Sequence, residues 1–342
     1  MADFGVVEAL QHGNLSGIMR ILLLALAASA ALLAATEFPE AEISNGTVTA
    51  RLYLPDAQNG YYRGTRFDWS GQIASLRVGG REYFGQWFDK YDPKIHDAIM
   101  GPVEEFLTDD TSPGYQEAPV GGNFVRIGVG VLRKPEDRAY ERFRTYDIVD
   151  PGRWTVRPAK DRIEFVHELK SDLGYAYRYT KTIRLVAGKP EMLIEHTLRN
   201  TGKKVIATHQ YNHNFFVMGE PTGPDTRVTF PFALKPKEPL SSNFAEVRDG
   251  KLVYTAELPK GPSVFTEFEG FGPSADDYDI RVENRKARAG VRIQGDRPIH
   301  KMIFWSIRPT VCPEAYISLE ISPGKQEKWT YRYTFYEAPP TP

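Results

Sequence analysis

Short runs of alternating apolar and polar residues recur along the chain, separated by turn signals. In residues 175–185, tyrosine and aliphatic side chains fall on one face, and arginine and threonine side chains fall on the other. A period of two is typical of a strand with one buried face. Gly188-Lys189-Pro190 predicts a turn into a second run at 191–198, and residues 329–335 repeat the alternation. Ten or more such segments, without a long amphipathic helix, predict an all-β fold, a large sandwich of antiparallel sheets.

The N-terminal stretch has a different character from the rest of the chain. Met19 and Arg20 precede an apolar run at residues 21–35 that ends in small residues, as secretory signals do. The polar residues before Met19 suggest that translation begins there. The apolar run is too short to span a membrane comfortably. We therefore expect an extension and signal peptide over residues 1–36 and a periplasmic or secreted protein, with no stable membrane anchor after cleavage. One β-sandwich domain is predicted over residues 37–342.

Composition narrows the function classes. The formal net charge of -1 argues against binding to a polyanion such as nucleic acid. The single cysteine excludes an internal disulfide, and no cysteine and histidine cluster has the spacing of a zinc site. We expect neither a metal nor a cofactor.

Residues 206–216 place two histidines on one predicted strand. They lie between turn signals, in a run rich in β-branched and aromatic residues. A strand histidine can simply be bonded to neighbouring hydroxyls, but two on one face also suit proton transfer near neutral pH. Alternation divides the run into two faces, one with His209, Tyr211, His213 and Phe215, the other with Gln210, Asn212, Asn214 and Phe216.

Residues 212–216, Asn-His-Asn-Phe-Phe, resemble the Asn-His-x-Tyr/Phe-Phe motif of aldose 1-epimerases, the galactose mutarotases. The resemblance implies that His213 is the general acid. Residues 311–314, Val-Cys-Pro-Glu, resemble the family's Cys-x-Glu element, which implies that Glu314 is the base. Glu320, with the same strand parity, is the alternate base.

Other segments extend the resemblance over most of residues 45–336. Residues 66–76 are similar to the family's opening strand, and residues 323–335 to its closing turn and last strand. Residues 277–279 look like its Tyr-Asp-His segment, which implies that Asp279 binds a sugar hydroxyl. The order of these motifs implies the large antiparallel supersandwich of galactose mutarotase-like proteins. His209 is expected to hold sugar hydroxyls, and Trp305 or Tyr211 to stack on the sugar ring.

The first half of the chain departs from the family pattern. At the places where the family has a substrate-binding arginine and a second histidine, residues 100–106 and 118–124 contain neither. His96, just upstream, is the candidate substitute. Glu104 and Glu105 stand where the cation is missing, and adjacent strand residues point to opposite faces, so only one can reach a site. With Glu104 as a candidate ligand, these carboxylates predict a neutral mono- or oligosaccharide.

These features predict an aldose 1-epimerase-like protein that interconverts sugar anomers. One group protonates the ring oxygen while another removes the proton of the anomeric hydroxyl. Two alternatives stay open. One is a carbohydrate-binding protein without turnover, which the missing arginine and histidine favour. The other is a polysaccharide lyase or hydrolase on a related sandwich, in which Tyr211 near His213 abstracts a proton next to a uronate carboxylate, or Glu104-Glu105 and Glu314 form a hydrolytic carboxylate pair.

Export has a direct test. Protein purified from its native host should begin between about residues 30 and 40, because cleavage is expected near the small residues at 34–35. Mass spectrometry of the intact protein measures this end. A chain that still begins at Met1 would contradict the prediction.

Overall fold

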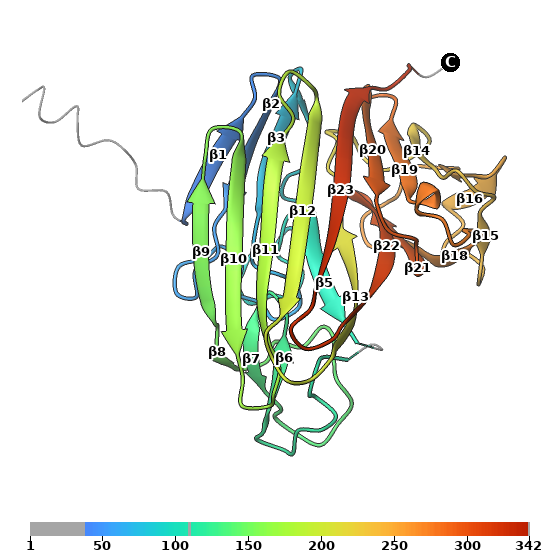
Figure 1. Cartoon of the computed structure of the whole chain (residues 1–342). Helices are drawn as coiled ribbons and strands as arrows, with labels where there is room; N and C mark the ends of the chain where they lie inside the picture. Colours follow the sequence, from blue (N-terminus) through green and yellow to red (C-terminus); the bar gives the residue numbers. More distant parts are fainter. Residues whose placement is uncertain (1–37, 109–110, 341–342) are drawn as a thin grey trace, which may run out of the picture. The chain divides into compact units, whose positions relative to one another are not determined.

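Residues 38–108 and 111–340 are described by a computed structural model, and strands dominate them (Figure 1). Within these ranges the helical element is a single 3₁₀ turn, η1 (Ala275–Asp277), and no helix has the length and apolarity needed to cross a membrane. The predicted signal peptide and the boundary between residues 36 and 37 lie outside the described residues. Both stay predictions.

The larger of the two main sheets has ten strands, and every neighbouring pair in it is antiparallel. In spatial order the strands are β16 (Ala245–Arg248), β17 (Lys251–Tyr254), β14 (Thr226–Thr229), β19 (Asp279–Asn284), β20 (Ala289–Gly295), β23 (Gln326–Glu337), β12 (Glu191–Asn200), β11 (Ala176–Leu185), β10 (Arg162–Lys170) and β9 (Arg153–Pro158).

A six-stranded sheet carries the residues of interest for function. Its spatial order is β15 (Lys235–Pro236), β18 (Val264–Glu269), β21 (Lys301–Ile307), β22 (Thr310–Ile321), β13 (Ile206–His213) and β5 (Val103–Leu107). Two smaller sheets contain β1 (Glu40–Ser44), β2 (Val48–Tyr53), β3 (Gln72–Val78) and β4 (Arg81–Glu82), and β6 (Asn123–Arg126), β7 (Gly130–Arg133) and β8 (Ile148–Asp150).

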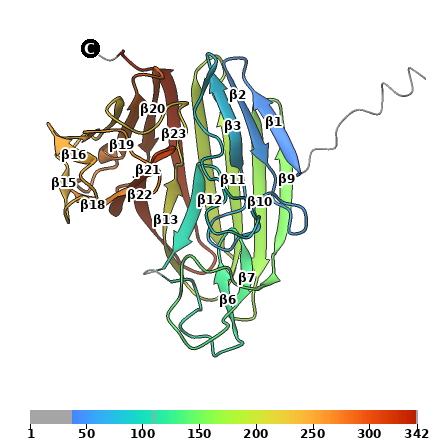
Figure 2. The ribbon, with the colours of Figure 1, turned by 180° about the vertical axis from the view of Figure 1, so that it is seen from behind.

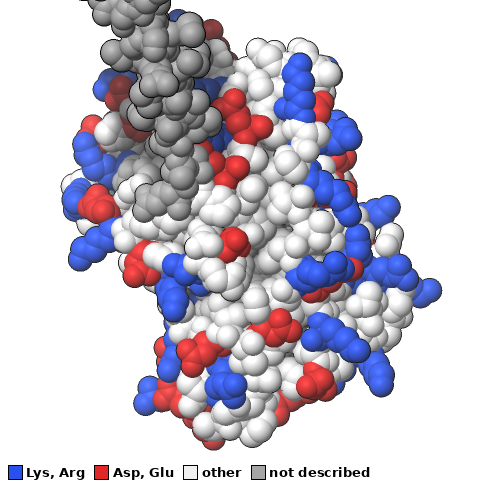
Figure 3. Space-filling model, turned by 90° about the vertical axis from the view of Figure 1, so that its left-hand side faces the viewer, with Lys and Arg blue, Asp and Glu red and all other residues white. Residues whose placement is uncertain are grey.

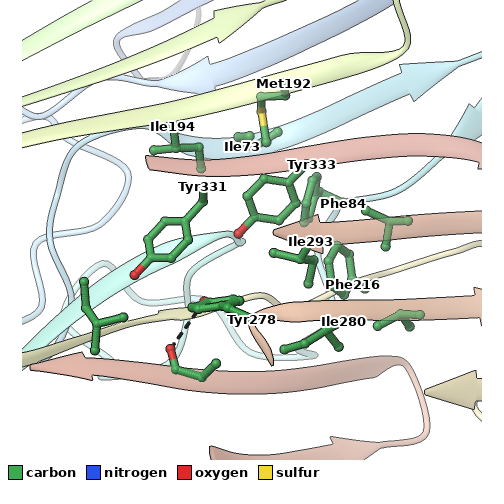
Figure 4. Packing of buried hydrophobic residues seen from close by; sticks show 14 of the residues in the cluster. Ile73, Phe84, Met192, Ile194, Phe216, Tyr278, Ile280, Ile293, Tyr331 and Tyr333 are labelled. Atoms are coloured by element: carbon green, nitrogen blue, oxygen red, sulfur yellow. Dashed lines mark hydrogen bonds between the residues drawn. The ribbon is translucent and has the colours of Figure 1, made fainter. Parts of the chain in front are cut away.

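The hydrophobic core lies between the ten-stranded sheet and a second layer of strands that packs against one of its faces. In Figures 1 and 2, β9 to β12 and β23 form one layer, with β1 to β3, β5, β13 and β22 on its other side. Apolar side chains from both layers meet there, as Figure 4 shows for Met192 and Ile194 of β12 beside Ile73 of β3. Tyrosine hydroxyls in this interior are bonded: Tyr331 donates to Gln210 Oε1 at 2.5 Å and Tyr333 donates to Asn214 Oδ1 at 2.8 Å.

The strands and the fold predicted from alternation are confirmed. The run at 175–185 corresponds to β11, which pairs through the predicted turn with β12, and the run at 329–335 lies within β23. β13 ends at His213, earlier than the predicted run, because Phe215 adopts a positive φ of 43° that turns the chain out of the strand. The large antiparallel sandwich is therefore the observed architecture.

A buried charged cluster joins the two main sheets. Glu104 of β5 is fully buried, accepts a hydrogen bond from Lys181 Nζ of β11, and lies 3.0 Å from His196 Nε2 of β12. Asp68 lies 3.9 Å from the same ammonium. Charges on the surface are arranged differently: on the face shown in Figure 3, basic and acidic side chains are interspersed. The buried cluster is thus part of the packing between the layers.

Replacing Lys181 with Met should destabilise the fold by about 3–5 kcal/mol, because it leaves Glu104 and Asp68 buried without their shared cation. Arg178→Met is the matched control. Arg178 lies on the same strand, but its side chain is 44% exposed and pairs with Glu168 at the surface. That pair should contribute less than about 1 kcal/mol. Urea denaturation measures both, and equal losses would contradict this account.

Candidate functional site

A cavity of about 340 Å³ opens on the six-stranded sheet, on the face turned away from the ten-stranded sheet. Gln210 and Asn212 bond to the ten-stranded sheet, so the alternate residues of β13 point to the opposite face. Strands and four connecting segments contribute to the wall, which is lined by Arg66, Trp87, His96, Asp97, Arg142, Phe143, His213, Phe215, Phe265, Lys301, Ile303, Trp305, Glu314 and Tyr316.

The register of two neighbouring strands brings His213 to Glu314. β13 pairs with β22 so that Gln210 lies opposite Ile317, and three further residues along each strand place His213 opposite Glu314. His213 Nε2 and Glu314 Oε1 are 3.1 Å apart. On the other side of β22, Ile303 of β21 lies directly opposite Glu314. The two predicted acid-base residues are therefore direct neighbours in the cavity wall.

Aromatic rings enclose the imidazole of His213. The positive φ of Phe215 accompanies a stacked contact in which its ring lies 3.7 Å from the imidazole, and the rings of Phe67 and Trp305 meet it edge-on. Burial lowers the pKa of His213 well below its usual value, and Arg66 and Arg142 add to the effect. His213 Nδ1 is buried and has no hydrogen-bond partner within the described part of the chain. The neutral imidazole thus meets Glu314 through Nε2 and leaves Nδ1 buried without a hydrogen bond.

Glu314 is buried beside this imidazole. Burial raises the pKa of the Glu314 carboxyl to about 8, although Arg142 and Arg66 oppose the shift. Burial favours the neutral form of each group. Near pH 7 the pair therefore holds one titratable proton in addition to the N–H of the neutral imidazole. Two interacting groups titrate as a pair, so the proton belongs to the pair as a whole.

A second carboxylate, Glu105, organises the cations of the cavity wall. It is fully buried on β5, where Arg66 Nε, Arg126 Nη2 and Arg142 Nη2 lie 3.0, 2.6 and 2.7 Å from its oxygens. The Tyr211 hydroxyl also donates to Glu105. Burial would raise the pKa of Glu105, but the three guanidinium groups hold it well below its usual range. Glu105 is therefore a fixed anion that positions Arg66 and Arg142.

Aromatic side chains form the outer part of the cavity. Phe143 and Phe265 are 58% and 48% exposed, which is unusual for phenylalanine, and both line the opening. Trp87 packs edge-on against Trp305 and stacks on Phe215, with ring centroids 4.7 Å apart in the stack. Trp87 also borders a second, larger cavity of about 870 Å³. The site thus combines aromatic faces with buried polar groups, an arrangement typical of small-molecule sites.

Four of the residues proposed from the sequence line this cavity: His213, Glu314, Trp305 and His96. Tyr211 lies behind the wall, fully buried, with its ring stacked on that of Tyr316 at 4.1 Å. It cannot stack on a ligand in the cavity, because Tyr316 lines the cavity at that place.

Three proposed ligands and the alternate base lie elsewhere. Glu104 faces the ten-stranded sheet, because alternation along β5 gives Glu105 the cavity side. Asp279 belongs to β19 of the ten-stranded sheet, where Arg292 Nε donates to it at 2.7 Å. His209 lies four residues before His213 on β13, beside the ring of His300 at 4.2 Å. Glu320 is exposed at the far end of β22.

The prediction of a neutral ligand needs correction. It rested on Glu104 and Glu105 repelling anions, but Lys181 and His196 surround the first carboxylate, and guanidinium groups surround the second. The absence of the family's arginine also predicts that the site lacks a cation. Arg66 and Arg142 reach the cavity from other segments and supply it.

Sequence reasoning missed the residues that the connecting segments bring to the site. Arg66 lies in the segment that resembles the family's opening strand, directly before Phe67, but no feature of the sequence indicates that its side chain belongs to a site. Arg142 and Phe143 lie between β7 and β8 in a segment without alternation, so no sequence signal identified them. Among the described residues no group of three or more potential metal ligands is found.

Comparisons of the structure with solved structures identify the fold. A galactose mutarotase related enzyme from Lactobacillus acidophilus is similar with a TM-score of 0.53 and 13% identity, over 88% of this chain and 98% of that one. A galactose mutarotase-like protein from Lactobacillus casei is similar with a TM-score of 0.52 and 13% identity, over 87% of this chain and 100% of that one. An aldose epimerase homologue from Caenorhabditis elegans is similar with a TM-score of 0.51 and 12% identity, over 87% of this chain and 99% of that one.

No protein-family model and no curated protein matches by sequence. At these identities the similarity establishes the fold, and the resemblance inferred from the sequence motifs is confirmed at that level. The chain has the galactose mutarotase-like β-sandwich fold.

Glu314→Gln should stabilise the protein at neutral and alkaline pH. The carboxyl's pKa rises from 4.5 to about 8 on folding, so its contribution to stability is complete below pH 4.5 and is lost as pH rises through 8. The variant's advantage should therefore appear above pH 4.5, grow until about pH 8, and reach on the order of a few kcal/mol. Thermal melts from pH 4 to 9 measure it. Glu320→Gln, an exposed change on the same strand, is the control, and a Glu314→Gln advantage independent of pH would contradict the argument.

Proposed function

We propose that the protein is an exported, aldose 1-epimerase-like enzyme that interconverts the anomers of a sugar. The adjacency of His213 and Glu314 in the wall of a sugar-sized cavity carries the proposal. The similar solved structures, which include a galactose mutarotase related enzyme, support it. The apolar run at residues 21–35 supports export.

Adjacent acid and base groups suit this reaction. The ring oxygen and the anomeric hydroxyl oxygen are bonded to the same carbon, so the groups that exchange protons with them must also lie close together. Nε2 of His213 and Oε1 of Glu314 meet this requirement at 3.1 Å. A sugar placed against the pair can give a proton to one group and take a proton from the other as the ring opens.

The pair holds the one proton that the reaction needs. The sequence resemblance gave the proton to His213, with Glu314 as the base. Burial instead favours Glu314 as the proton carrier in the free protein, because it raises the pKa of the carboxyl and lowers that of the imidazole. Ring closure runs the two transfers backwards, so each group acts once as acid and once as base.

The other cavity residues bind and orient the sugar. Trp305 and the exposed Phe143 and Phe265 offer apolar faces for the hydrogen-bearing face of a pyranose ring. The side chain of His96 is 32% exposed, and its Nε2 lies 3.4 Å from Oδ2 of Asp97. This pair presents polar atoms to sugar hydroxyls. The cavity volume of about 340 Å³ suits one sugar ring.

The two alternatives lose part of their support. The lyase hypothesis used Tyr211, but its hydroxyl is buried and bonded to Glu105 and Arg142. The hypothesis of binding without turnover drew on a missing arginine, and Arg66 and Arg142 now occupy the cavity wall.

His213→Ala and Glu314→Gln should each lower kcat by about 10² to 10⁴ while sugar affinity changes little, because acid-base groups act mainly in the transition state. Polarimetry on freshly dissolved α-glucose, α-galactose and a panel of other reducing sugars, uronic acids included, measures the rate. Asp279→Asn, in the ten-stranded sheet, is the control and should retain activity.

The same assay has a pH signature. Activity should fall as pH rises through about 8, where the pair loses its proton, and should fall again in acid as His213 is protonated. A wild-type protein that accelerates mutarotation of no sugar in the panel would exclude the epimerase proposal.

A further inference from the structure

The cations around Glu105 outnumber the negative charge available to them. Three guanidinium groups, those of Arg66, Arg126 and Arg142, contact this single buried carboxylate. One carboxylate balances one guanidinium, so two positive charges remain in excess. Charge held away from water is costly unless it is paired. The arrangement therefore lacks an anion.

The excess charge lies at the cavity wall. Arg126 is fully buried and directed inward, where it donates to the carbonyl oxygens of Phe106 and Arg66. Arg66 and Arg142, in contrast, line the cavity, with side chains 8% and 26% exposed. In the described part of the chain, these two side chains donate hydrogen bonds through Nε and Nη2. Their Nη1 groups remain as donors for a ligand.

The remaining charges of the wall do not cancel this excess. Lys301 adds a third lining cation, and its Nζ lies 3.9 Å from Glu267 outside the cavity. Two carboxyl groups line the cavity among the described residues, those of Asp97 and Glu314. Burial opposes a fall in the pKa of Asp97, but His96 and Arg66 lower it, so Asp97 is ionised near pH 7. Glu314 has a pKa of about 8 and is mostly neutral there. Close to neutral pH, the cavity therefore presents more positive than negative charge.

We propose that the cavity binds a sugar bearing a negatively charged substituent, a carboxylate or a phosphate, which Arg66, Arg142 and Lys301 receive. Guanidinium groups form strong, charge-assisted hydrogen bonds with both kinds of anion, and their planar donors fit them in a defined orientation. The sugar ring lies against the aromatic side chains, with its anomeric carbon at His213 and Glu314. The proposal rests on the proposed function and specifies its substrate class, in place of the neutral sugar expected from the sequence.

Calorimetric titration of the intact protein with glucose, glucuronate and glucose 6-phosphate, and with the galactose series, tests the proposal. At least one anionic sugar of each series should bind about tenfold or more tightly than its neutral parent. Its affinity should fall as salt rises, whereas that of the neutral sugar should not. The uronate and phosphate arms identify which anion fits. Neutral sugars that bind as well as both anionic forms would overturn the proposal.

A matched pair of variants assigns the effect to the cavity. Lys301→Gln should weaken binding of the preferred anionic sugar on the order of threefold and leave the neutral sugar unchanged. Lys237→Gln is the control, because Lys237 pairs with the same Glu267 at 3.2 Å but does not line the cavity. Both side chains are partly exposed, so neither change should unfold the protein. Equal effects of the two variants would overturn the assignment.

Binding and turnover are read separately. Anion-selective binding without polarimetric activity would retain this inference and exclude the epimerase. Release of an unsaturated product from a polyuronate, seen as ultraviolet absorbance, would also retain the anionic ligand but replace epimerisation by elimination. Polarimetric activity with selectivity for neutral sugars would do the reverse, supporting the epimerase and overturning the anionic ligand.

Discussion

The pairing of β13 with β22 is the constraint on which the site depends. Their antiparallel register sets His213 opposite Glu314, and the chain leaves β13 directly after His213. A shift of one residue would turn His213 toward the ten-stranded sheet and bring Asn212 or Asn214 into the cavity wall. The register is held on the other face by Gln210 and Asn212, which bond to tyrosines of β23. One face of β13 thus bonds to the polar interior, and the other face brings His213 to Glu314 of β22.

Burial sets the protonation states of Glu314 and His213, and it also lowers the stability of the fold. Removing Glu314 from water makes it a carboxylic acid near neutral pH, and removing His213 from water keeps the imidazole neutral. Arg66 and Arg142 oppose the rise in the pKa of Glu314 and reinforce the fall in the pKa of His213, but burial is the largest cause of both shifts. Strained or destabilised groups at functional sites are compensated elsewhere, here by the large apolar core between the sheets.

The predictable part of this protein was local. Alternation identifies strands such as β11 and β23, and short motifs identify His213 and Glu314, which lie on strands and line the cavity. The sequence alone does not determine which face of β5 is turned toward the cavity. The sequence showed that only one of Glu104 and Glu105 could face a site, but the choice between them depends on how β5 pairs with β13. The position of Arg142 also depends on long-range packing, so no local sequence pattern predicts that it reaches the cavity.

The site also divides its parts between two kinds of structure. Strands supply the acid-base pair, whereas Arg66, Arg142, His96 and Phe143 come from connecting segments between strands. Connecting segments tolerate substitution and insertion far better than paired strands do. The connecting segments of the cavity wall can therefore diverge between descendants, while His213 and Glu314 on paired strands are inherited intact. For an engineer, the same division makes those segments the place to vary when a new ligand is wanted.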